Sequence, residues 1–358
     1  MNIPLKYNFR SLLVRRVSTL MTVGSIALVV SIFIGVMSLA GGLEAVLVSS
    51  GDPRNVLVRR RGSDSELSSY FTRDALQFLR FLPGVAAGPD GEPAASPEIV
   101  VLLNLPKIGE AQGANVIIRG VTPAGLRLRP QLKVVQGRLF QPGLREAVVS
   151  RNISRRFEHT QYGETVRFGK AEWKIVGIFE AGHTAFDSEI WVDLNQAAGD
   201  FNRDLYSTVL LQTTGTAAAG RLIDRVEEDR RYNLTAQPEM DYFREQTKSA
   251  APIKLLGMFI AVVMGVGACF AAMNTMYAAV AHRTQEIATL RVLGFRPGRI
   301  LVSFMTESLL LALLGGALGC LLALPLHGIS TGTANWQTFS ELTFAFRITP
   351  RLLGFGML

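Results

Sequence analysis

The sequence predicts an α-helical transmembrane bundle, with four spans expected, that carries an inserted α+β extracytoplasmic domain. Three runs of the chain are nearly free of charged residues, and each is long enough to cross a bilayer, which takes about 20 apolar residues in a helix. Between the first and second runs, roughly 200 residues of mixed polarity alternate short β-rich stretches with helical patterns. These two observations predict a membrane protein with one large domain outside the spans.

The N-terminal segment Ile3–Arg16 is predicted to form an amphipathic helix. Leu5, Phe9, Leu12 and Leu13 recur at helical spacing, and basic residues occupy the other side. Such a helix would lie along the cytoplasmic surface of the membrane. The alternative is a basic tail that only sets the topology of the first span.

The three long apolar runs are interrupted only once, by Glu307 in the third. A fourth apolar run, Leu352–Leu358, has seven residues, about 10 Å of helix, which cannot cross a hydrocarbon core of about 30 Å. We expect this run to be the start of a fourth span that is cut short, so that an even number of spans would return the C-terminus to the cytoplasm. The long runs lie between Arg16 and Glu44, between Lys254 and His282, and from Arg299 through Leu326.

The formal net charge of +8 is concentrated next to the apolar runs, which argues against nucleic-acid binding. Between Gly51 and Ala250, 26 lysines and arginines are matched by 25 acidic residues. Because short cytoplasmic segments are enriched in Lys and Arg, the basic segments are expected in the cytoplasm and the large domain outside. The excess positive charge comes from Lys6, Arg10, Arg15 and Arg16 and from Arg283, Arg291, Arg296 and Arg299.

The large domain has no cysteine, since Cys269 and Cys320 both fall in predicted spans. No disulfide framework is therefore expected, and a domain of roughly 200 residues can rely on its own hydrophobic core. Glu239–Lys254 has a helical pattern that runs into the second span, so we expect that span to extend outward as a stalk. The segment Gly88–Pro97, rich in Gly, Pro and acidic residues, is predicted to be a loop.

Regular elements of the large domain follow from alternation and capping signals. The predicted strands are Asn55–Arg60, Ile99–Leu103, Val116–Gly120, Ala147–Ser150, Thr165–Phe168, Trp173–Phe179, Ile190–Val192 and Val209–Gln212, and the predicted helices are Glu66–Phe81 and Ala217–Arg231. The predicted division of the chain is 1–47 for the amphipathic helix and first span, 48–240 for the domain, 241–326 for the stalk and spans two and three, and 327–358 for a short loop and the start of a fourth span.

Fewer than 20 residues, the coupling loop 282–299, join the second and third spans on the cytoplasmic side. Its first part, Thr284–Leu293, is predicted to be helical, and Pro297 and Gly298 are predicted to break the helix before Ile300 begins the next span. A short helix held between two spans could pass a push from a cytoplasmic partner into the membrane. The alternative is a plain polar loop that obeys the positive-inside rule. The helix would place Glu286, Leu290 and Leu293 on one side and Arg283, Ile287 and Arg291 on a neighbouring one.

The sequence pattern of this loop resembles that of the MacB/FtsX-type family of ABC-transporter permeases. The family pattern runs Arg-x-x-Glu-Ile-x-x-x-Arg-x-Leu-Gly, then Ile, a Glu inside the third span, and Gly-Gly. The matching residues are Arg283, Glu286, Ile287, Arg291, Leu293, Gly294, Ile300, Glu307, Gly315 and Gly316. Residues 134–157 and 172–194 are also similar to the periplasmic domain of the MacB and lipoprotein-release branches, so the resemblance covers nearly the whole chain.

The resemblance implies four spans, two paired permeases, identical or paralogous, and a cytoplasmic ATPase, in two copies, that grips a coupling helix on each permease. Carried over by position, that helix comprises Arg283, Glu286, Ile287, Leu290, Arg291, Leu293 and Gly294. MacB carries its ATPase ahead of the first span, whereas the ATPase is expected here as a separate subunit, and this sequence has no Gly-x-x-x-x-Gly-Lys-Ser/Thr phosphate loop. No cofactor is therefore expected on this chain, and ATP–Mg would be used by the partner ATPase. A periplasmic adaptor, an outer-membrane channel and membrane lipid complete the expected partners.

Two features inside the spans have both a structural and a functional interpretation. Glu307 is an ionisable residue in a span, so it either makes a structural hydrogen bond or takes part in coupling. Gly315 and Gly319 form a Gly-x-x-x-Gly pair beside Gly316, which lets helix backbones approach closely, either within one subunit or between two. The second span repeats this small-residue pattern at Gly257, Ala261, Gly265 and Gly267.

No arrangement of residues suggests catalysis or metal binding. His159 and His183 have no second His or Cys at metal spacing, and no triad or paired-carboxylate pattern occurs. Together with this absence, the family resemblance implies a non-catalytic permease subunit of the bacterial inner membrane that exports a hydrophobic or periplasmic cargo, such as a lipid, lipoprotein, peptide or drug. The alternatives are a subunit that regulates a periplasmic hydrolase or a sensor kinase without moving cargo, and a membrane enzyme whose site is not visible in the sequence.

Overall fold

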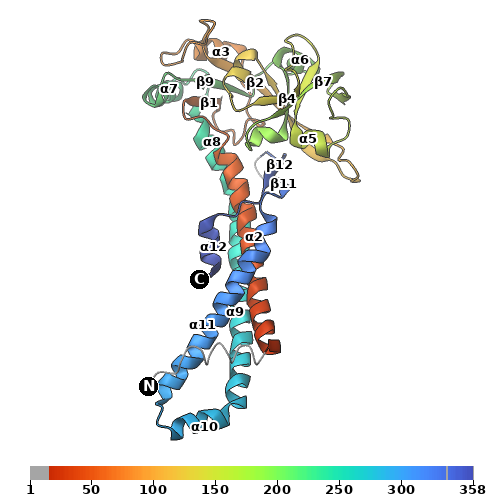
Figure 1. The fold of residues 1–358 in the computed structure, drawn as a ribbon. Coiled ribbons are helices and arrows are strands. Elements are labelled where there is room, and N and C mark those ends of the chain that lie inside the picture. The colour runs from red at the N-terminus through yellow and green to blue at the C-terminus, as the bar shows by residue number, and fades with distance from the viewer. Residues whose placement is uncertain (1–15, 336–337, 358) are drawn as a thin grey trace. The chain divides into compact units, whose positions relative to one another are not determined.

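The computed structural model describes residues 16–335 and 338–357, and the predicted amphipathic helix lies outside this range except for Arg16 (Figure 1). The chain forms two compact units. Within the described residues, the helical unit takes its members from Met1–Gly42, Ala250–Ile329 and Ala345–Leu358, and the α+β unit from Leu43–Ser249 and Ser330–Phe344.

Long apolar helices make up most of the helical unit. Among the described residues, three stretches are long and apolar enough to cross a membrane, Thr19–Val48, Ala251–His282 and Pro297–Leu326, which confirms the three predicted runs. The fourth span stays a prediction, because α12 has eight residues. The helices are α2 Arg16–Val48, whose last residues belong to the α+β unit, α9 Ala251–His282, α10 Thr284–Val292, α11 Pro297–Ala323, the 3₁₀ turn η3 Leu324–Leu326 and α12 Pro350–Met357.

The α+β unit is built on one ten-stranded sheet in the order β10-β1-β9-β2-β3-β8-β5-β7-β4, with β6 paired to β7. The pairs β3–β8 and β5–β7 are parallel and the others are antiparallel. The strands are β1 Asn55–Arg60, β2 Ala95–Leu105, β3 Ala114–Val121, β4 Lys133–Gly137, β5 Glu146–Ser150, β6 Thr165–Phe168, β7 Ala171–Glu180, β8 Glu189–Asp193, β9 Thr208–Gln212 and β10 Leu234–Pro238. A separate pair joins β11 Ser330–Ala334 to β12 Glu341–Ala345.

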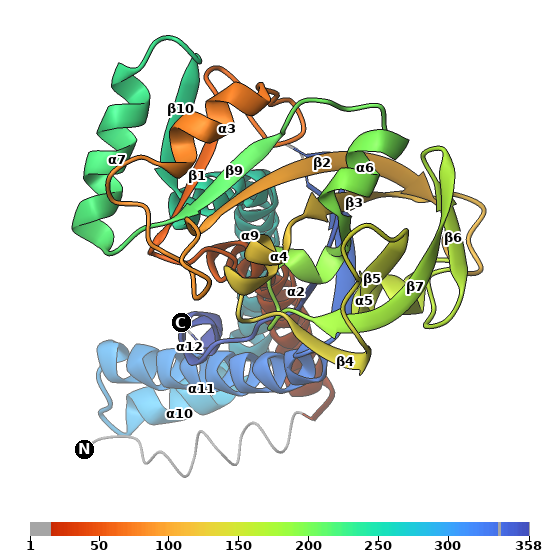
Figure 2. The ribbon, with the colours of Figure 1, turned by 90° about the horizontal axis from the view of Figure 1, so that it is seen from above.

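Short helices cover this sheet. Figure 2 shows α3 and α7 at the β10–β1–β9 end and α6 beside β2 and β3. The segment α8–η2–α9 carries the chain from β10 into the second apolar helix, which confirms the helical pattern predicted for Glu239–Lys254, with a 3₁₀ turn within it. The helices are α3 Arg73–Arg80, α4 Pro123–Arg127, α5 Arg151–Arg156, η1 Ala185–Ser188, α6 Leu194–Asp200, α7 Thr216–Glu228, α8 Glu239–Gln246 and η2 Thr247–Ala250.

All eight predicted strands are confirmed, and two predictions next to them are wrong in extent. The helix predicted from Glu66 begins only at Arg73, because the Glu66 side chain is drawn into a buried charge cluster under the sheet. The loop predicted to extend to Pro97 ends earlier, since β2 begins at Ala95. At Pro97 only β9 pairs with β2, and β3 joins from Ile99 onward, so the proline lies where β2 is locally an edge strand.

Two apolar cores lie on the sheet. One contains Ile99, Ile118 and Ile190 of β2, β3 and β8, and the other contains Val56, Val209 and Leu222 at the β10–β1–β9 end. Because side chains alternate across a strand, the neighbours Glu98, Arg119 and Glu189 point to the opposite face. This alternation creates the buried charge cluster described below.

Candidate functional site

The helix α10 is the central element of the coupling loop, and local signals set both of its ends. Arg283 is its N-cap residue, and Gly294 adopts a left-handed backbone with φ of 87° just after its C-cap. The Gly294 N–H donates to the Arg291 carbonyl at 3.1 Å, and the Phe295 N–H donates to the Leu290 carbonyl at 3.1 Å, which is the Schellman pattern. The glycine therefore ends the helix and turns the chain toward α11.

Pro297 was expected to break the helix, and this expectation is wrong. The residue is the first of α11, which runs from Pro297 to Ala323. A proline is well tolerated at the first helical position, because the N–H that it lacks would have no partner in the helix there. The third span thus begins directly after the turn at Phe295 and Arg296, and Glu307 lies about 15 Å along it at 1.5 Å per residue.

Replacing Gly294 with alanine is expected to lower the free energy of unfolding by about 1–2 kcal/mol, because a Cβ atom is unfavourable in the left-handed region. The matched control is Gly298→Ala in the first turn of α11, where an added Cβ meets nothing within 4 Å. Thermal unfolding of both variants in detergent checks this. An equal midpoint for the two variants would contradict the role assigned to Gly294.

One side of α10 faces α11 and the other is exposed. Arg283, Ile287 and Leu290 are half-buried, whereas Val292 and Leu293 are 87% and 70% exposed. The half-buried residues come from both of the predicted sides, Arg283 and Ile287 from one and Leu290 from the other. Leu293 lies beyond the last residue of α10 as its C-cap. Four exposed residues, Glu286, Arg291, Val292 and Leu293, give the rest of this segment both charged and apolar side chains.

An ion pair joins the start of α10 to α11. The Arg283 Nη1 atom lies 3.4 Å from Glu307 Oε2, and these side chains are 13% and 6% exposed. The Arg283 guanidinium also lies 4.0 Å from the carboxylate of Glu286. A carboxylate in an apolar span is costly unless a cation or hydrogen bond compensates it, and Arg283 provides that compensation. A displacement of α10 would have to move or break this pair.

The glycines of α11 pack against other helices of the same unit. A Cβ atom on Gly315 would lie 2.7 Å from the Ile26 side chain, and one on Gly319 would lie 2.7 Å from the Ala27 carbonyl oxygen. Gly316 instead faces α12, where the Gly356 carbonyl would be 3.4 Å from the added atom. In the second span Gly257 approaches Val36 of α2, while Gly265 and Gly267 have open space. The close approach of α11 to α2 therefore depends on the absence of side chains.

Gly319→Ala is expected to destabilise the protein by about 1–3 kcal/mol, because the added methyl group meets a backbone oxygen that cannot rotate away. Gly267→Ala on α9 is the control, since its Cβ would be in open space and alanine favours helix. Thermal unfolding in detergent is the measurement. A midpoint for Gly319→Ala equal to that of Gly267→Ala would show that α2 and α11 are not held at this distance.

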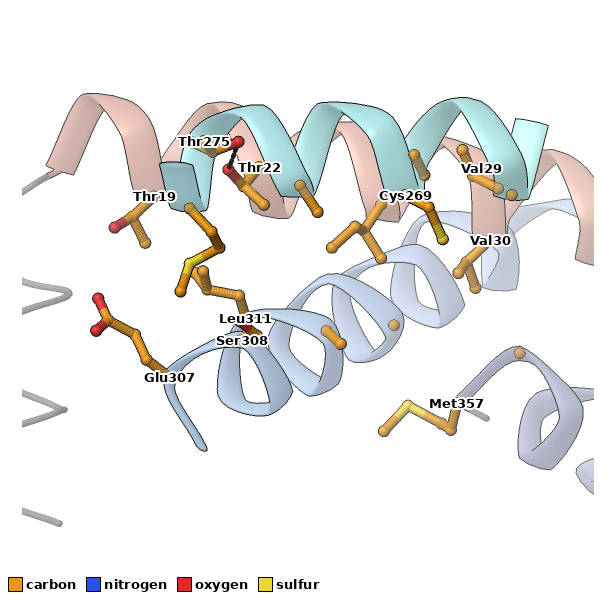
Figure 3. Close-up of a pocket in the computed structure, with 18 residues that line it drawn as sticks. Thr19, Thr22, Val29, Val30, Cys269, Thr275, Glu307, Ser308, Leu311 and Met357 are labelled. Atoms are coloured by element: carbon orange, nitrogen blue, oxygen red, sulfur yellow. Dashed lines mark hydrogen bonds between the residues drawn. The ribbon is translucent and has the colours of Figure 1, made fainter. Parts of the chain in front are cut away.

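A cavity of about 450 Å³ lies among α2, α9, α11 and α12. Most of its lining is apolar, and hydroxyl groups add the polar part, including Thr22 and Thr275, whose oxygens are 3.4 Å apart. In Figure 3 the Glu307 carboxylate lies at one end of this cavity and Met357 at the other. Glu307 thus borders both the cavity and the coupling loop.

The sequence analysis missed a buried charge cluster on the face of the sheet opposite the cores. Arg119 donates to Glu66, Glu98 and Glu189 over 2.7 to 3.1 Å, and its side chain is 1% exposed. Arg129 donates to Glu98 at 2.5 and 3.0 Å. The signal was present, because Glu98 directly precedes the apolar run Ile99–Leu103 and Arg119 interrupts the apolar run Val116–Val121. Such residues are buried only when they are paired.

The first residue of α8 connects this cluster to the stalk. Burial raises the pKa of Glu239, and the charge of Arg129 and hydrogen bonds from the Asp52 N–H and the Asn55 amide offset this only in part. For Glu98, burial would also raise the pKa, but the charges of Arg129 and Arg119 reverse the effect, and its pKa lies below the ordinary value. The cluster therefore holds its central carboxylate ionised.

The two histidines considered above as metal ligands lie in irregular segments of the α+β unit. His159 and His183 have left-handed backbones with φ of 55° and 61°. No group of three or more His, Cys, Asp or Glu residues suited to a metal ion occurs in the described part of the chain.

The described chain has three apolar helices of spanning length, with an α+β unit inserted between the first and second and the short exposed helix α10 between the second and third. This is the arrangement of a membrane permease component. The chain belongs to the MacB/FtsX-like family of ABC transporter permeases. Residues 19–229 match the MacB-like periplasmic core domain, and residues 258–358 match the FtsX-like permease C-terminal region. The family resemblance found in the sequence is confirmed.

Curated relatives agree with this assignment. The chain is 24% identical over 360 residues to the uncharacterized ABC transporter permease YknZ of Bacillus subtilis, which covers 92% of this chain and 87% of that protein. It is 24% identical to the macrolide export ATP-binding/permease protein MacB of Bdellovibrio bacteriovorus over 63% of this chain, and 23% identical to that of Bordetella avium over 91%. The chain spans only 38% and 52% of the length of these two MacB proteins.

A solved structure, the extracellular domain of YknZ, is similar to 51% of this chain and 99% of its own length, with a TM-score of 0.37 and 18% identity.

Proposed function

We propose that this protein is the permease subunit of a bacterial inner-membrane ABC complex and that α10 docks on a separate cytoplasmic ATPase. The observation that carries the proposal is the exposed patch formed by Arg291, Val292 and Leu293 at the end of α10. The start of the same helix is anchored to α11 by the Arg283–Glu307 pair. Arginine and apolar side chains together form the kind of patch that a protein partner buries. ATP and Mg²⁺ would bind to the partner.

The proposed work of the subunit is conformational. ATP-driven movement of the ATPase would push α10, shift α9 and α11, and change the α+β unit through α8, which is joined to α9 by the 3₁₀ turn η2. The mostly apolar lining of the cavity between the spans supports this mechanism over a hydrophilic pathway for an ion or a sugar.

Export of a hydrophobic or periplasmic cargo is the function that the family favours, because the MacB relatives are named as macrolide export proteins. A second permease copy or paralogue, a periplasmic adaptor and an outer-membrane channel belong to this proposal as partners. Regulation of a periplasmic hydrolase or a sensor kinase remains the competing proposal, and the subunits that copurify would separate the two.

Copurification from membranes in a mild detergent, followed by mass spectrometry of bound subunits and lipids, tests the proposal. We expect an ABC ATPase in equal amount to the permease, together with adaptor-type proteins for export. Recovery of a hydrolase or kinase with the ATPase would favour regulation. Recovery of the permease without any ATPase would refute the proposed function.

A further inference from the structure

The hairpin β11–β12 lies between α11 and α12 in the sequence, yet it belongs to the α+β unit. The hairpin residues Ser330–Phe344 cluster with Leu43–Ser249, more than 80 residues earlier in the chain. Leu342 and Phe344 are only 4% and 3% exposed, so the hairpin is packed as part of this unit. The sequence analysis had assigned these residues to a short loop.

Hydrogen bonds attach the hairpin to three separate elements. The Thr343 N–H donates to Ser188 Oγ of η1 at 2.8 Å, and the Asn335 amide donates to Gln246 Oε1 of α8 at 2.9 Å. The Asn115 amide of β3 donates to the Phe339 carbonyl at 3.1 Å. The hairpin is therefore fixed at several points, which restricts its movement relative to the unit.

A buried carboxylate strengthens this attachment. The Glu341 side chain is 8% exposed and lies between two cations, Lys107 Nζ at 2.9 Å and the Arg156 guanidinium. Arg156 also donates to Thr343 Oγ1 at 3.0 Å. Separating the hairpin from the unit would take the Glu341 carboxylate away from both of its cations, which is costly for a buried charge.

The segment η1 receives contacts from three segments that lead into apolar helices. Its Ala185 N–H donates to Ser50 Oγ, two residues after the end of α2, at 2.8 Å. The Phe186 ring meets the Phe243 ring of α8 edge-on, with centroids 5.6 Å apart. Ser188 accepts the hydrogen bond from the hairpin, and the next residue, Glu189, binds Arg119 of the charge cluster. Movement of any one of these segments is thus delivered to the same point of the sheet.

We infer that the β11–β12 hairpin is a third mechanical connection between the spans and the α+β unit, acting beside the end of α2 and the α8 stalk, with η1 as the point where all three connections meet. The coupling loop is followed directly by α11 and then by the hairpin, so a push on α10 can reach the α+β unit along the chain through α11 as well as through α9. This inference rests on the proposed function, because it requires the spans to move during ATP hydrolysis.

Hydrogen–deuterium exchange on the assembled complex, with and without ATP and vanadate, tests the inference. In the wild-type complex, nucleotide is expected to change exchange in both the coupling loop and residues 181–189, because exchange reports local opening. Glu341→Ala should reduce the change at 181–189 by at least half while leaving the change in the coupling loop intact. Glu110→Ala is the matched control, since Glu110 pairs with the same Lys107 at 3.6 Å but does not touch the hairpin.

A disulfide provides the complementary variant if Glu341→Ala loosens the fold. Ser188→Cys/Thr343→Cys, in a background with Cys269→Ala and Cys320→Ala, should form the bond, because the Thr343 N–H lies 2.8 Å from the Ser188 side-chain oxygen and the two residues are direct neighbours. The locked complex should keep its nucleotide response at 181–189. A full response in Glu341→Ala, or a response abolished by the lock, would overturn the inference. A wild-type complex with no nucleotide response anywhere would instead refute the proposed function.

Discussion

Arg119→Met is expected to lower the free energy of unfolding by about 3–5 kcal/mol, because removing one partner of a buried ion cluster leaves uncompensated charge. Three carboxylates would lose their shared cation, since Arg119 binds Glu66, Glu98 and Glu189 with a side chain that is 1% exposed. Methionine keeps much of the side-chain volume, so the loss reports charge more than a cavity. Thermal or denaturant unfolding of the full chain in detergent measures it.

Two further variants make this expectation specific. Arg231→Met removes an arginine whose side chain is 70% exposed, so the loss of its ion pair with Asp229 should change the stability little. Adding Glu189→Gln to Arg119→Met removes one of the stranded charges and should recover part of the loss. Equal unfolding midpoints for Arg119→Met and Arg231→Met would show that the buried cluster does not stabilise the sheet and the start of α8.

Arg291→Ala and Glu286→Ala are expected to lower the ATPase activity of the assembled complex while leaving membrane insertion unchanged. Both side chains are exposed on α10, so the folded permease loses little. A hot-spot residue of a protein interface contributes more than about 1 kcal/mol to binding, and a loss of about 1.4 kcal/mol corresponds to a tenfold weaker affinity for the partner. Titration of detergent-solubilised permease with the ATPase, read as turnover, measures this shift.

Arg230→Ala, an exposed arginine of the α+β unit, is the control for that experiment. Its titration should match that of the wild-type permease. Unchanged turnover and affinity in both α10 variants would count against the assignment of α10 as the coupling helix. A loss of membrane insertion would mean that these residues set topology, which is the plain-loop alternative.

The fold could be predicted from the sequence wherever the determining interactions are local. The apolar runs predicted three helices correctly, because a span in lipid must be apolar along its whole length. The β-branched runs predicted eight strands correctly, because these strands bury apolar side chains in the core of the α+β unit. The strand β4 was missed because Lys133–Gly137 is largely exposed and ends in glycine, so its pairing with β7 supplies what the pattern lacks. The strand β10 was missed because it is short and ends at Pro238.

Long-range interactions account for the rest of what the sequence did not reveal. Glu66 has helical neighbours in the sequence, but its salt bridge to Arg119 holds it outside α3. The hairpin Ser330–Ala345 has few apolar residues in its first strand, and only contacts with Lys107, Arg156 and Ser188 explain its burial. In the coupling loop the order of residues identified the family, but only the structure distinguished the inner side of α10 from the exposed one.

Photo-crosslinking from α10 tests the central claim most directly. A benzophenone amino acid placed at Val292, which is 87% exposed, should crosslink to an ABC ATPase subunit in intact membranes, while the same probe at Val262 on the apolar face of α9 should not. Capture of the ATPase from position 292 alone is the result that the proposed mechanism predicts. Crosslinks from position 292 to lipid only, in membranes that contain the assembled complex, would contradict it.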